Sequence, residues 1–452
     1  MKTFQDLTDV GASEKARMDF VLAAIREHKQ TDEYFMAENA ELYYSHRNPT
    51  ITRYQKIVRN LLGQPVVDSF SANHKLAANW FFYFTTQAVQ YLLGNGVTFE
   101  NEHTKEKFGK DFDGKLQKMA TYAKVGGTAF AFFNVDKVET FKLTEFVPLY
   151  DEETGALSAG IRFWQIDGSK PLRATLYEKD GYTEYIQRKG EDMEVRQEKR
   201  PYKERVYRND IQTEILDGEN YPGFPVVPLY NTNRQSDLVG NRGTLDAYDL
   251  MVSKLVNNVS EGDLVYWILK NADGMDDMDD VQFLERLRTI GVAHVREDGE
   301  VEAHKVEAPF AANDSTIDKL KHQLFSDFMA LNVEQIQAGN VTATQIKAAY
   351  EPLNQKTDLF EYEVIDFIHR LSELAGVDDE PSFKRSVIAN QTEETNMVLA
   401  AAPYLDDETL LDKLPFVTPD EKKSILERKD AEALERMSAT VEETTEEENA
   451  EE

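Results

Sequence analysis

The side chains best able to do chemistry in this sequence are its carboxylates, because 82 aspartates and glutamates stand against 51 lysines and arginines. Among so many acids, two that could share general acid and base work are always found, so such a pair is no sign of catalysis. The sequence contains no G-x-x-x-x-G-K-[ST] loop, no G-x-G-x-x-G after a strand, no H-E-x-x-H and no G-x-S-x-G. We therefore expect a protein that is not an enzyme and binds no cofactor.

Patterns that could hold a metal are equally weak. The acidic run at 273–280 resembles a cation loop, but Gly274 does not fall where an EF-hand turns, and the bidentate glutamate is missing. His294 and His304 flank a predicted hairpin around Asp298–Gly299, where a surface pair across two strands is the simpler interpretation. The chain has no cysteine, so it has no disulfide and no thiolate ligand. We expect no bound metal.

Composition limits the class of protein. With 452 residues, 41% of them hydrophobic, the chain is long enough for two or three domains around a large core. A formal charge of −31 argues against a surface that holds nucleic acid by neutralising phosphates, although such a charge also simply keeps a protein soluble. The first residues lack the apolar run of a signal peptide, and an intracellular origin is expected.

Apolar spacing predicts the elements of the first half, which we interpret as α+β. Residues 76–99 carry no charge, but polar residues and a Gly94–Gly96 turn favour a buried amphipathic helix over a membrane span. "GGTAFAFFNVD" and "GIRFWQID" are typical of strands, and "ATLYEKDGYTEYIQ" of a hairpin turning at Asp180–Gly181. Residues 1–35 are predicted to be helical and polar. The apolar face of the buried helix is Leu76, Trp80, Phe84, Ala88 and Tyr91.

The second half is predicted as two striped helices that bracket a small α/β insert. Three prolines between Pro222 and Pro228 favour an extended connector, after which a new unit begins. Ser315 and Asp318 have the spacing of a capping pair and predict the start of the second helix. The stripes are Leu245, Tyr248, Val252, Leu255 and Val259 in the first helix, and Ile317, Leu320, Leu324 and Phe328 in the second.

A nearly neutral stretch, "QIQAGNVTATQIKAAY" at 335–350, follows the second helix and carries a single charge, Lys347. A glycine and β-branched residues predict a short loop between two helices there. Beyond it a long helix is expected to end at Gly376, with Pro352 as a kink or an early break. A further helical region is predicted at 392–436.

Four stretches in this order resemble the portal proteins, or head-to-tail connectors, of long-tailed double-stranded DNA bacteriophages. They are "VPLYNTNRQSDL" leading into "TLDAYDLMVSKLVNNVSEG", the insert with its second helix, the neutral loop, and "YLDDETLLDKLPFVTPDEKKSILER". Upstream, "LLGNGVTF" and "AKVGGTAFAFF" are similar to the outer domain of that family, so the resemblance covers roughly residues 35 to 435. One departure is that Thr342-Ala343-Thr344-Gln345 stands where the family often has Ser-Gly before Ala.

The resemblance implies an α+β portal fold assembled as a ring, with an α/β wing, a helical stem, a small α/β clip and a helical crown. Its implied parts are an N-terminal helical segment at 1–33, the wing at 34–240, stem helix one at 241–262, the clip at 263–313, stem helix two at 314–335, the tunnel loop at 336–345, the crown at 346–437 and a disordered acidic tail at 438–452.

The function that the resemblance implies is a dodecamer at one capsid vertex, a channel through which double-stranded DNA is packaged and ejected. Implied partners are the terminase motor, a head-completion or tail adaptor protein, and capsid and scaffolding proteins, with no membrane. The protein would belong to the virion after assembly in the host cytoplasm. The two stripes would pack the stem. The implied DNA-facing residues of the tunnel loop are Gly339, Asn340, Val341, Thr342, Ala343, Thr344, Gln345 and Lys347.

Small hydroxyl and amide side chains beside one lysine hold phosphates far more weakly than an arginine cluster, so a neutral loop permits DNA to slide. Two alternatives remain open at this stage. A soluble acidic hydrolase using carboxylate pairs would be a monomer or dimer with a concave acidic pocket. Another phage minor head protein would form no closed ring by itself.

Overall fold

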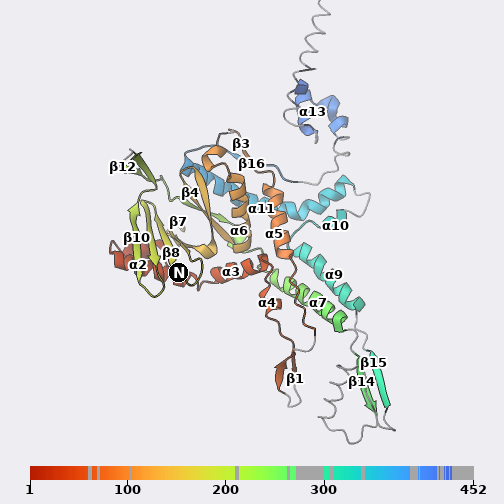
Figure 1. The fold of residues 1–452 in the computed structure, drawn as a ribbon. Helices are drawn as coiled ribbons and strands as arrows, with labels where there is room; N and C mark the ends of the chain where they lie inside the picture. The colour runs from red at the N-terminus through yellow and green to blue at the C-terminus, as the bar shows by residue number, and fades with distance from the viewer. Residues whose placement is uncertain are drawn as a thin grey trace, which may run out of the picture. The chain divides into compact units, whose positions relative to one another are not determined.

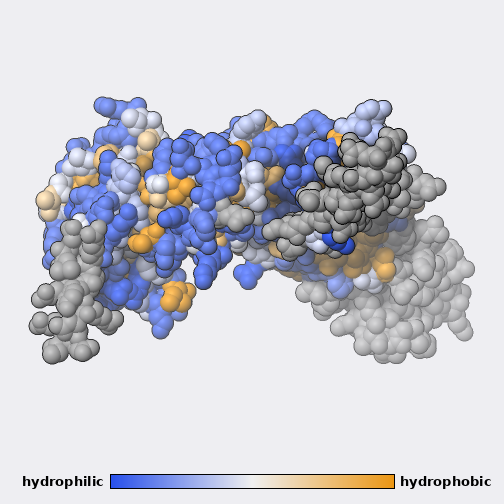
Figure 2. All heavy atoms as spheres, turned by 90° about the horizontal axis from the view of Figure 1, so that it is seen from above, coloured by the Kyte–Doolittle hydropathy of each residue, from blue (hydrophilic) through white to orange (hydrophobic). Residues whose placement is uncertain are grey.

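The computed structural model describes residues 1–59, 64–68, 72–101, 103–208, 213–261, 265–270, 300–305, 310–336 and 342–386, then 395, 398–414, 417, 422, 424–426 and 428–429. Figure 1 shows the fold of the chain, which divides into two compact units by its internal contacts. One comprises Met1–Ala330 and Leu353–Arg385, and the other Leu331–Pro352 and Ser386–Glu452. On the face drawn in Figure 2, hydrophilic residues cover most of the described surface and hydrophobic residues form small separate patches.

A three-stranded antiparallel sheet lies at the core of the first unit, in the order β13-β4-β5. Its strands are β4 (Thr128–Asn134), β5 (Lys137–Lys142) and β13 (Val226–Tyr230). Side chains alternate between the two faces of a strand, so Phe130 and Phe132 share one face. There the ring centroid of Phe130 lies 4.5 Å from that of Phe146, and the ring centroid of Phe132 lies 4.9 Å from that of Tyr177, both in a second sheet. The other face carries the small side chain of Ala129, and helix α6 (Phe112–Gly126) packs against the sheet there.

The second sheet is a five-stranded antiparallel meander in the order β10-β9-β8-β7-β6. Helix α2 (Glu14–His28) covers it, and Phe20, Val21 and Ile25 are buried there. The prediction of a polar N-terminal region was therefore wrong in part, because this region supplies five of the fourteen buried residues of that core. The strands are β6 (Phe146–Tyr150), β7 (Leu157–Trp164), β8 (Leu172–Glu178), β9 (Gly181–Gln187) and β10 (Met193–Arg200).

The other elements of this region are short or lie at its edges. They are α1 (Phe4–Asp9), α3 (Asp32–Tyr44), α4 (Pro49–Thr52), β1 (Ile57–Arg59), β2 (Pro65–Val67), α5 (Trp80–Leu93), β3 (Val97–Phe99), η1 (Lys105–Phe108), η2 (Leu143–Glu145), β11 (Lys203–Arg208), β12 (Thr213–Glu219) and η3 (Thr232–Arg234). Strand β3 pairs with β16 (Pro381–Phe383).

Most local predictions for the first half are confirmed. Both strand sequences form strands, and β8 and β9 form the hairpin predicted at Asp180–Gly181. The buried helix is α5, but it begins at Trp80, so the prediction for Leu76 was wrong: it precedes the helix and is largely exposed. The prediction of an extended proline-rich connector is confirmed only for its second part, strand β13, whereas Pro222, Gly223 and Pro225 lie in bends. Pro228 is tolerated because β13 is an edge strand of its sheet.

The second half contains the two expected helices, α7 (Arg242–Glu261) and α9 (Phe310–Asp327), which pack against each other. Helix α9 begins before Ser315, so the predicted capping pair lies inside the helix and that prediction was wrong. Between the helices, β14 (Val265–Lys270) pairs with β15 (Glu300–Lys305), and His304 is in register with Tyr266. The acidic run at 273–280, His294 and the turn at Asp298–Gly299 lie outside the described residues.

The long helix predicted after the neutral loop is α11 (Ala343–Ala375), with Pro352 inside it and no break. It ends before Gly376, as predicted, where a backbone φ of +67° favours glycine. The described remainder is α10 (Val333–Ile336), η4 (Ala402–Tyr404) and α13 (Asp407–Lys413), and the predicted tail at 438–452 lies outside it. None of the described helices is long and apolar enough to cross a membrane.

Candidate functional site

The predicted stem residues nearest the wing meet in one aromatic cluster. Leu245 of α7 and Leu324 of α9 are buried there together with Phe328, just after α9. The ring of Phe328 stacks on Phe84 of α5 at 4.7 Å, and Tyr248 packs against this cluster from α7. The two stripes therefore meet, but they do so around α5, a partner that their spacing alone could not reveal.

The far ends of the same stripes are less covered. Val252 and Leu255 of α7, and Ile317 and Leu320 of α9, are only partly buried. Val259, the last residue of the first stripe, is 62% exposed. The apolar face of the helix pair thus continues beyond the core that the described residues build for it.

A polar face of α7 holds an extended segment of the chain, residues 74–78. Side chains four residues apart on a helix are about 6 Å apart along its axis, which is close to the length of two residues in extended backbone. Polar side chains at this spacing can therefore accept hydrogen bonds from every second backbone amide of the extended segment. We call the three resulting hydrogen bonds the ladder. Sequence reasoning missed it, although the spacing of the three polar residues of α7 is visible in the sequence. Its bonds run from His74 N to Asn257 Oδ1 at 2.7 Å, from Leu76 N to Ser253 Oγ at 2.9 Å, and from Ala78 N to Asp249 Oδ1 at 2.9 Å.

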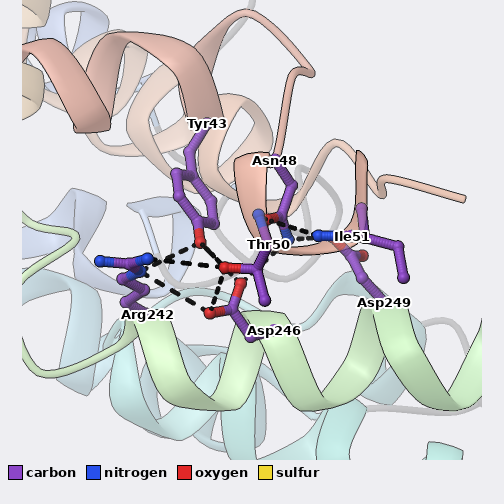
Figure 3. Close-up of polar contacts among 7 residues, drawn as sticks. All are labelled: Tyr43, Asn48, Thr50, Ile51, Arg242, Asp246 and Asp249. Atoms are coloured by element: carbon purple, nitrogen blue, oxygen red, sulfur yellow. Dashed lines mark hydrogen bonds and ion pairs between the residues drawn. The ribbon is translucent and has the colours of Figure 1, made fainter. Parts of the chain in front are cut away.

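The first turns of α7 are fixed to α3 and α4 by a network centred on Asp246 (Figure 3). The Tyr43 hydroxyl donates to Asp246 Oδ1 at 2.6 Å, and the Thr50 hydroxyl donates to Oδ2 at 3.0 Å. Asn48 Nδ2 donates to Oδ1 at 3.0 Å. Arg242 Nε lies 3.6 Å from Oδ2 and donates to the Tyr43 hydroxyl at 3.1 Å. One carboxylate thereby joins α3 and α4 to α7.

Asp249, one turn further along α7, is almost fully buried. Burial raises the pKa of its carboxyl to about 6, although hydrogen bonds from Ala78 N and from Asn48 Nδ2 act in the opposite direction. This residue belongs both to the ladder and to the network of Figure 3, so it connects the two.

A buried charge cluster holds the segment that leads into α7. Lys124 of α6 is 2% exposed, and its Nζ lies 3.8 Å from Asp237 Oδ2, which also pairs with Lys356 of α11 at 2.7 Å. Asn231 Nδ2 donates to Asp237 Oδ1 at 2.7 Å. Lys124 Nζ lies 4.0 Å from the ring centre of Phe360. The cluster ties α6, the segment before α7 and α11 together.

Burial and charge shift the pKa values of this cluster in opposite directions. Burial lowers the pKa of the Lys124 ammonium to about 8, although Asp237 raises it in part. Burial alone would raise the pKa of Asp237, but the two ammonium groups and two hydrogen bonds outweigh it and lower the value to about 2. The carboxylate is therefore ionised at neutral pH and compensates the charge of Lys124, which water cannot reach, together with that of the partly exposed Lys356.

The tunnel-loop residues are only partly described. Gly339, Asn340 and Val341 lie outside the described residues, whereas Ala343, Thr344, Gln345 and Lys347 belong to the first turns of α11. The helix thus begins within the predicted loop, and Thr344, Gln345 and Lys347 are exposed on it.

The departure from the family pattern at the start of this helix is a capping box. Gln345 N donates to Thr342 Oγ1 at 3.3 Å, and Thr342 N donates to Gln345 Oε1 at 3.0 Å. Thr-x-x-Gln satisfies two backbone donors that a helix start would leave without partners. Thr342 therefore has a structural role that its assignment as a DNA-facing residue did not include.

Comparison with known proteins identifies the family. The model of the family "Phage portal protein, SPP1 Gp6-like" matches residues 24–443, and the chain belongs to this family. The resemblance read from the sequence is thereby confirmed.

Two portal proteins are among the relatives. That of Bacillus phage SPP1 is 24% identical over 351 residues, which span 73% of this chain and 66%, just under two thirds, of the relative. That of Clostridium phage phiCD119 is 23% identical, with 87% of this chain and 92% of the relative covered.

Solved structures show a more distant likeness. A chain from the neck of a native gene transfer agent particle is 10% identical with a TM-score of 0.38, covering 77% of this chain and 89% of that one. An HK97 family phage portal protein from Corynebacterium diphtheriae is 10% identical with a TM-score of 0.34, covering 67% and 89%. Family membership therefore rests on the sequence match.

Proposed function

We propose that this chain is a portal subunit, twelve copies of which form a ring at one capsid vertex and surround a channel for double-stranded DNA. The observation that carries the proposal is the family match over residues 24–443. The role is structural: the ring guides DNA during packaging and ejection and involves no catalysis. The protein is thus part of the virion, and it assembles in the host cytoplasm.

Helices α7 and α9 would line the channel as the stem. The anchorage of α7 through Asp246, and of the segment before it through the Lys124–Asp237 pair, supports this role, because a channel wall must not shift when DNA passes. The net charge of −31 per chain opposes adhesion of a polyanion. Thr344 and Gln345, exposed at the start of α11, would contact DNA without holding its phosphates.

The partners of the ring follow from its parts. The clip, residues 263–313, would dock the terminase motor and the head-completion or tail adaptor protein, and the β14–β15 pair belongs to it. The wing would contact capsid and scaffolding proteins.

The first test is the mass and shape of the purified protein, by mass photometry and negative-stain imaging. Twelve subunits of 51.7 kDa would give a ring of about 620 kDa with a central hole. A particle of one or two subunits with no ring at any salt concentration would overturn the proposal. It would favour the acidic hydrolase, or a minor head protein that does not close a ring.

The neutral loop has its own test in the variant Thr344→Arg. An added cation at an exposed position should bind phosphate and slow translocation, so rings should form normally while the amount of DNA packaged falls. Thr344→Gln is the matched control without charge. Thr342 is unsuitable for this test because its replacement removes the helix cap, which is worth about 1 kcal/mol. Normal packaging by the arginine variant would refute the explanation of the neutral loop.

A further inference from the structure

The antiparallel β1–β2 ribbon of the first unit exposes four aliphatic side chains that lie close together. Ile57 is opposite Val67, and Val58 is opposite Val66. Their exposed fractions are 63% for Ile57, 53% for Val67, 39% for Val58 and 40% for Val66. In Figure 1, β1 lies below α4 and away from the two larger sheets.

Both faces of this ribbon are apolar. Neighbouring residues of a strand point to opposite faces, so the Ile57–Val67 pair lies on one face and the Val58–Val66 pair on the other. A two-stranded ribbon is only marginally stable in water unless something packs against it. Four aliphatic side chains on a ribbon that the described part of the chain leaves uncovered therefore indicate a surface that another molecule covers.

The base of the ribbon is firmly held. Asp68 N donates to Lys56 O at 2.8 Å and closes the pairing, and Lys75 Nζ donates to the carbonyl of Thr52 at 2.8 Å. Ile51 of α4 is buried. The segment after the ribbon continues into residues 74–78, which α7 holds through its ladder. The ribbon is thus an arm presented from a fixed base.

Charge indicates what this arm meets. Residues 45–68 contain four bases, Arg47, Arg53, Lys56 and Arg59, and one acid, Asp68, which lies 3.8 Å from Lys56, so this segment carries +3 and the rest of the chain −34. An apolar arm on a basic segment complements an acidic surface, and the molecule richest in such surface at a ring is the next copy of the chain. A ring also needs two unlike faces that fit each other on every subunit, and the arm supplies one of them.

We propose that the β1–β2 ribbon packs against the neighbouring copy of this chain and helps to close the ring. This inference rests on the proposed portal function and adds to it a contact between subunits. Nucleic acid, the other partner of a basic ribbon, suits the apolar side chains less well, because neither aliphatic face offers hydrogen bonds to base edges.

The absence of cysteine allows a direct test, because an introduced cysteine is the single thiol of the chain. Ile57→Cys is labelled with a thiol-reactive photo-crosslinker and irradiated after assembly, with and without duplex DNA. Gly168→Cys is the control, since Gly168 is exposed, has no atom within 4 Å of an added Cβ and lies far from the ribbon in sequence. Crosslinks between copies at least about tenfold above the control are expected. Crosslinks within one chain only, or only to DNA, would overturn the proposal.

A second variant, Ile57→Thr with Val67→Thr, keeps strand propensity but removes apolar contact. Each subunit contact should weaken by about tenfold, so rings should form at higher protein concentrations, while the thermal unfolding of the subunit changes little. If the wild type forms rings and this variant forms them at the same concentration, the ribbon inference fails and the portal function stands. If the wild type forms no rings at all, both fail.

Discussion

Replacing Asp237 by asparagine should destabilise the first unit strongly, because it leaves the buried ammonium group of Lys124 and the partly buried one of Lys356 without a counter-ion. Lys124 is 2% exposed and cannot regain water, whereas Lys356 can do so in part. Removing one partner from a buried ion pair costs about 3–5 kcal/mol. Lys124 can instead release its proton. For a lysine with the ordinary pKa of 10.5, losing the proton costs about 5 kcal/mol at pH 7, so the variant should lose no more than about 5 kcal/mol of stability by this route.

Urea unfolding followed by circular dichroism would measure this loss, together with hydrogen exchange at the Asp237 amide, which donates to Lys124 O at 2.9 Å. The matched control is Asp366→Asn. Asp366 pairs with Arg370 at a similar distance, 2.8 Å, but both side chains are about half exposed, so its loss should stay below about 0.5 kcal/mol. Equal effects of the two variants, both under about 1 kcal/mol, would refute the reasoning that Asp237 compensates buried charge.

Three further perturbations have defined outcomes. The folded chain holds the Lys124 proton less tightly than the unfolded chain, so the free energy of unfolding should rise between pH 8 and 10.5 by up to about 1.4 kcal/mol per pH unit. Urea unfolding midpoints measured across that range would show this rise, and the Lys124→Met variant should lack it. Ser253→Ala should cost about 1 kcal/mol and speed hydrogen exchange at the Leu76 amide; an unchanged exchange rate would mean that the ladder bond is not formed in solution. Gly127 has a φ of +85°, and an added Cβ would lie 2.8 Å from a carbonyl oxygen, so Gly127→Ala should lower the free energy of unfolding by at least about 1 kcal/mol. Gly114→Ala, on the exposed face of α6, should instead raise it by up to about 1 kcal/mol in the same thermal melt.

Elements with a strong local pattern could be predicted from the sequence. Strand β4 and the β8–β9 hairpin follow from β-branched and aromatic runs and from an Asp-Gly turn, which act over a few residues. The start of α9 was predicted wrongly because Ser315 and Asp318 fit a capping pattern. The residues before them, including two alanines, favour helix as well, so the helix continues through the pattern to Phe310.

For each contact of the candidate site, the sequence could indicate one partner but not the other. The sequence shows that Asp249, Ser253 and Asn257 share a face of a helix, but their partners lie 171 to 183 residues away. Nothing local distinguishes them from an ordinary solvated face. The same holds for Lys124 and Asp237, which look like surface charges in the sequence until three separate segments enclose them.

The ladder on α7 also separates two kinds of evolutionary constraint. The helix contributes side chains, whereas residues 74–78 contribute only their backbone amides to the three bonds. Substitution of His74, Leu76 or Ala78 leaves those amides in place, with proline as the exception because it has no N–H. Related sequences should therefore vary freely at these three positions while avoiding proline, and should keep acceptors at 249, 253 and 257.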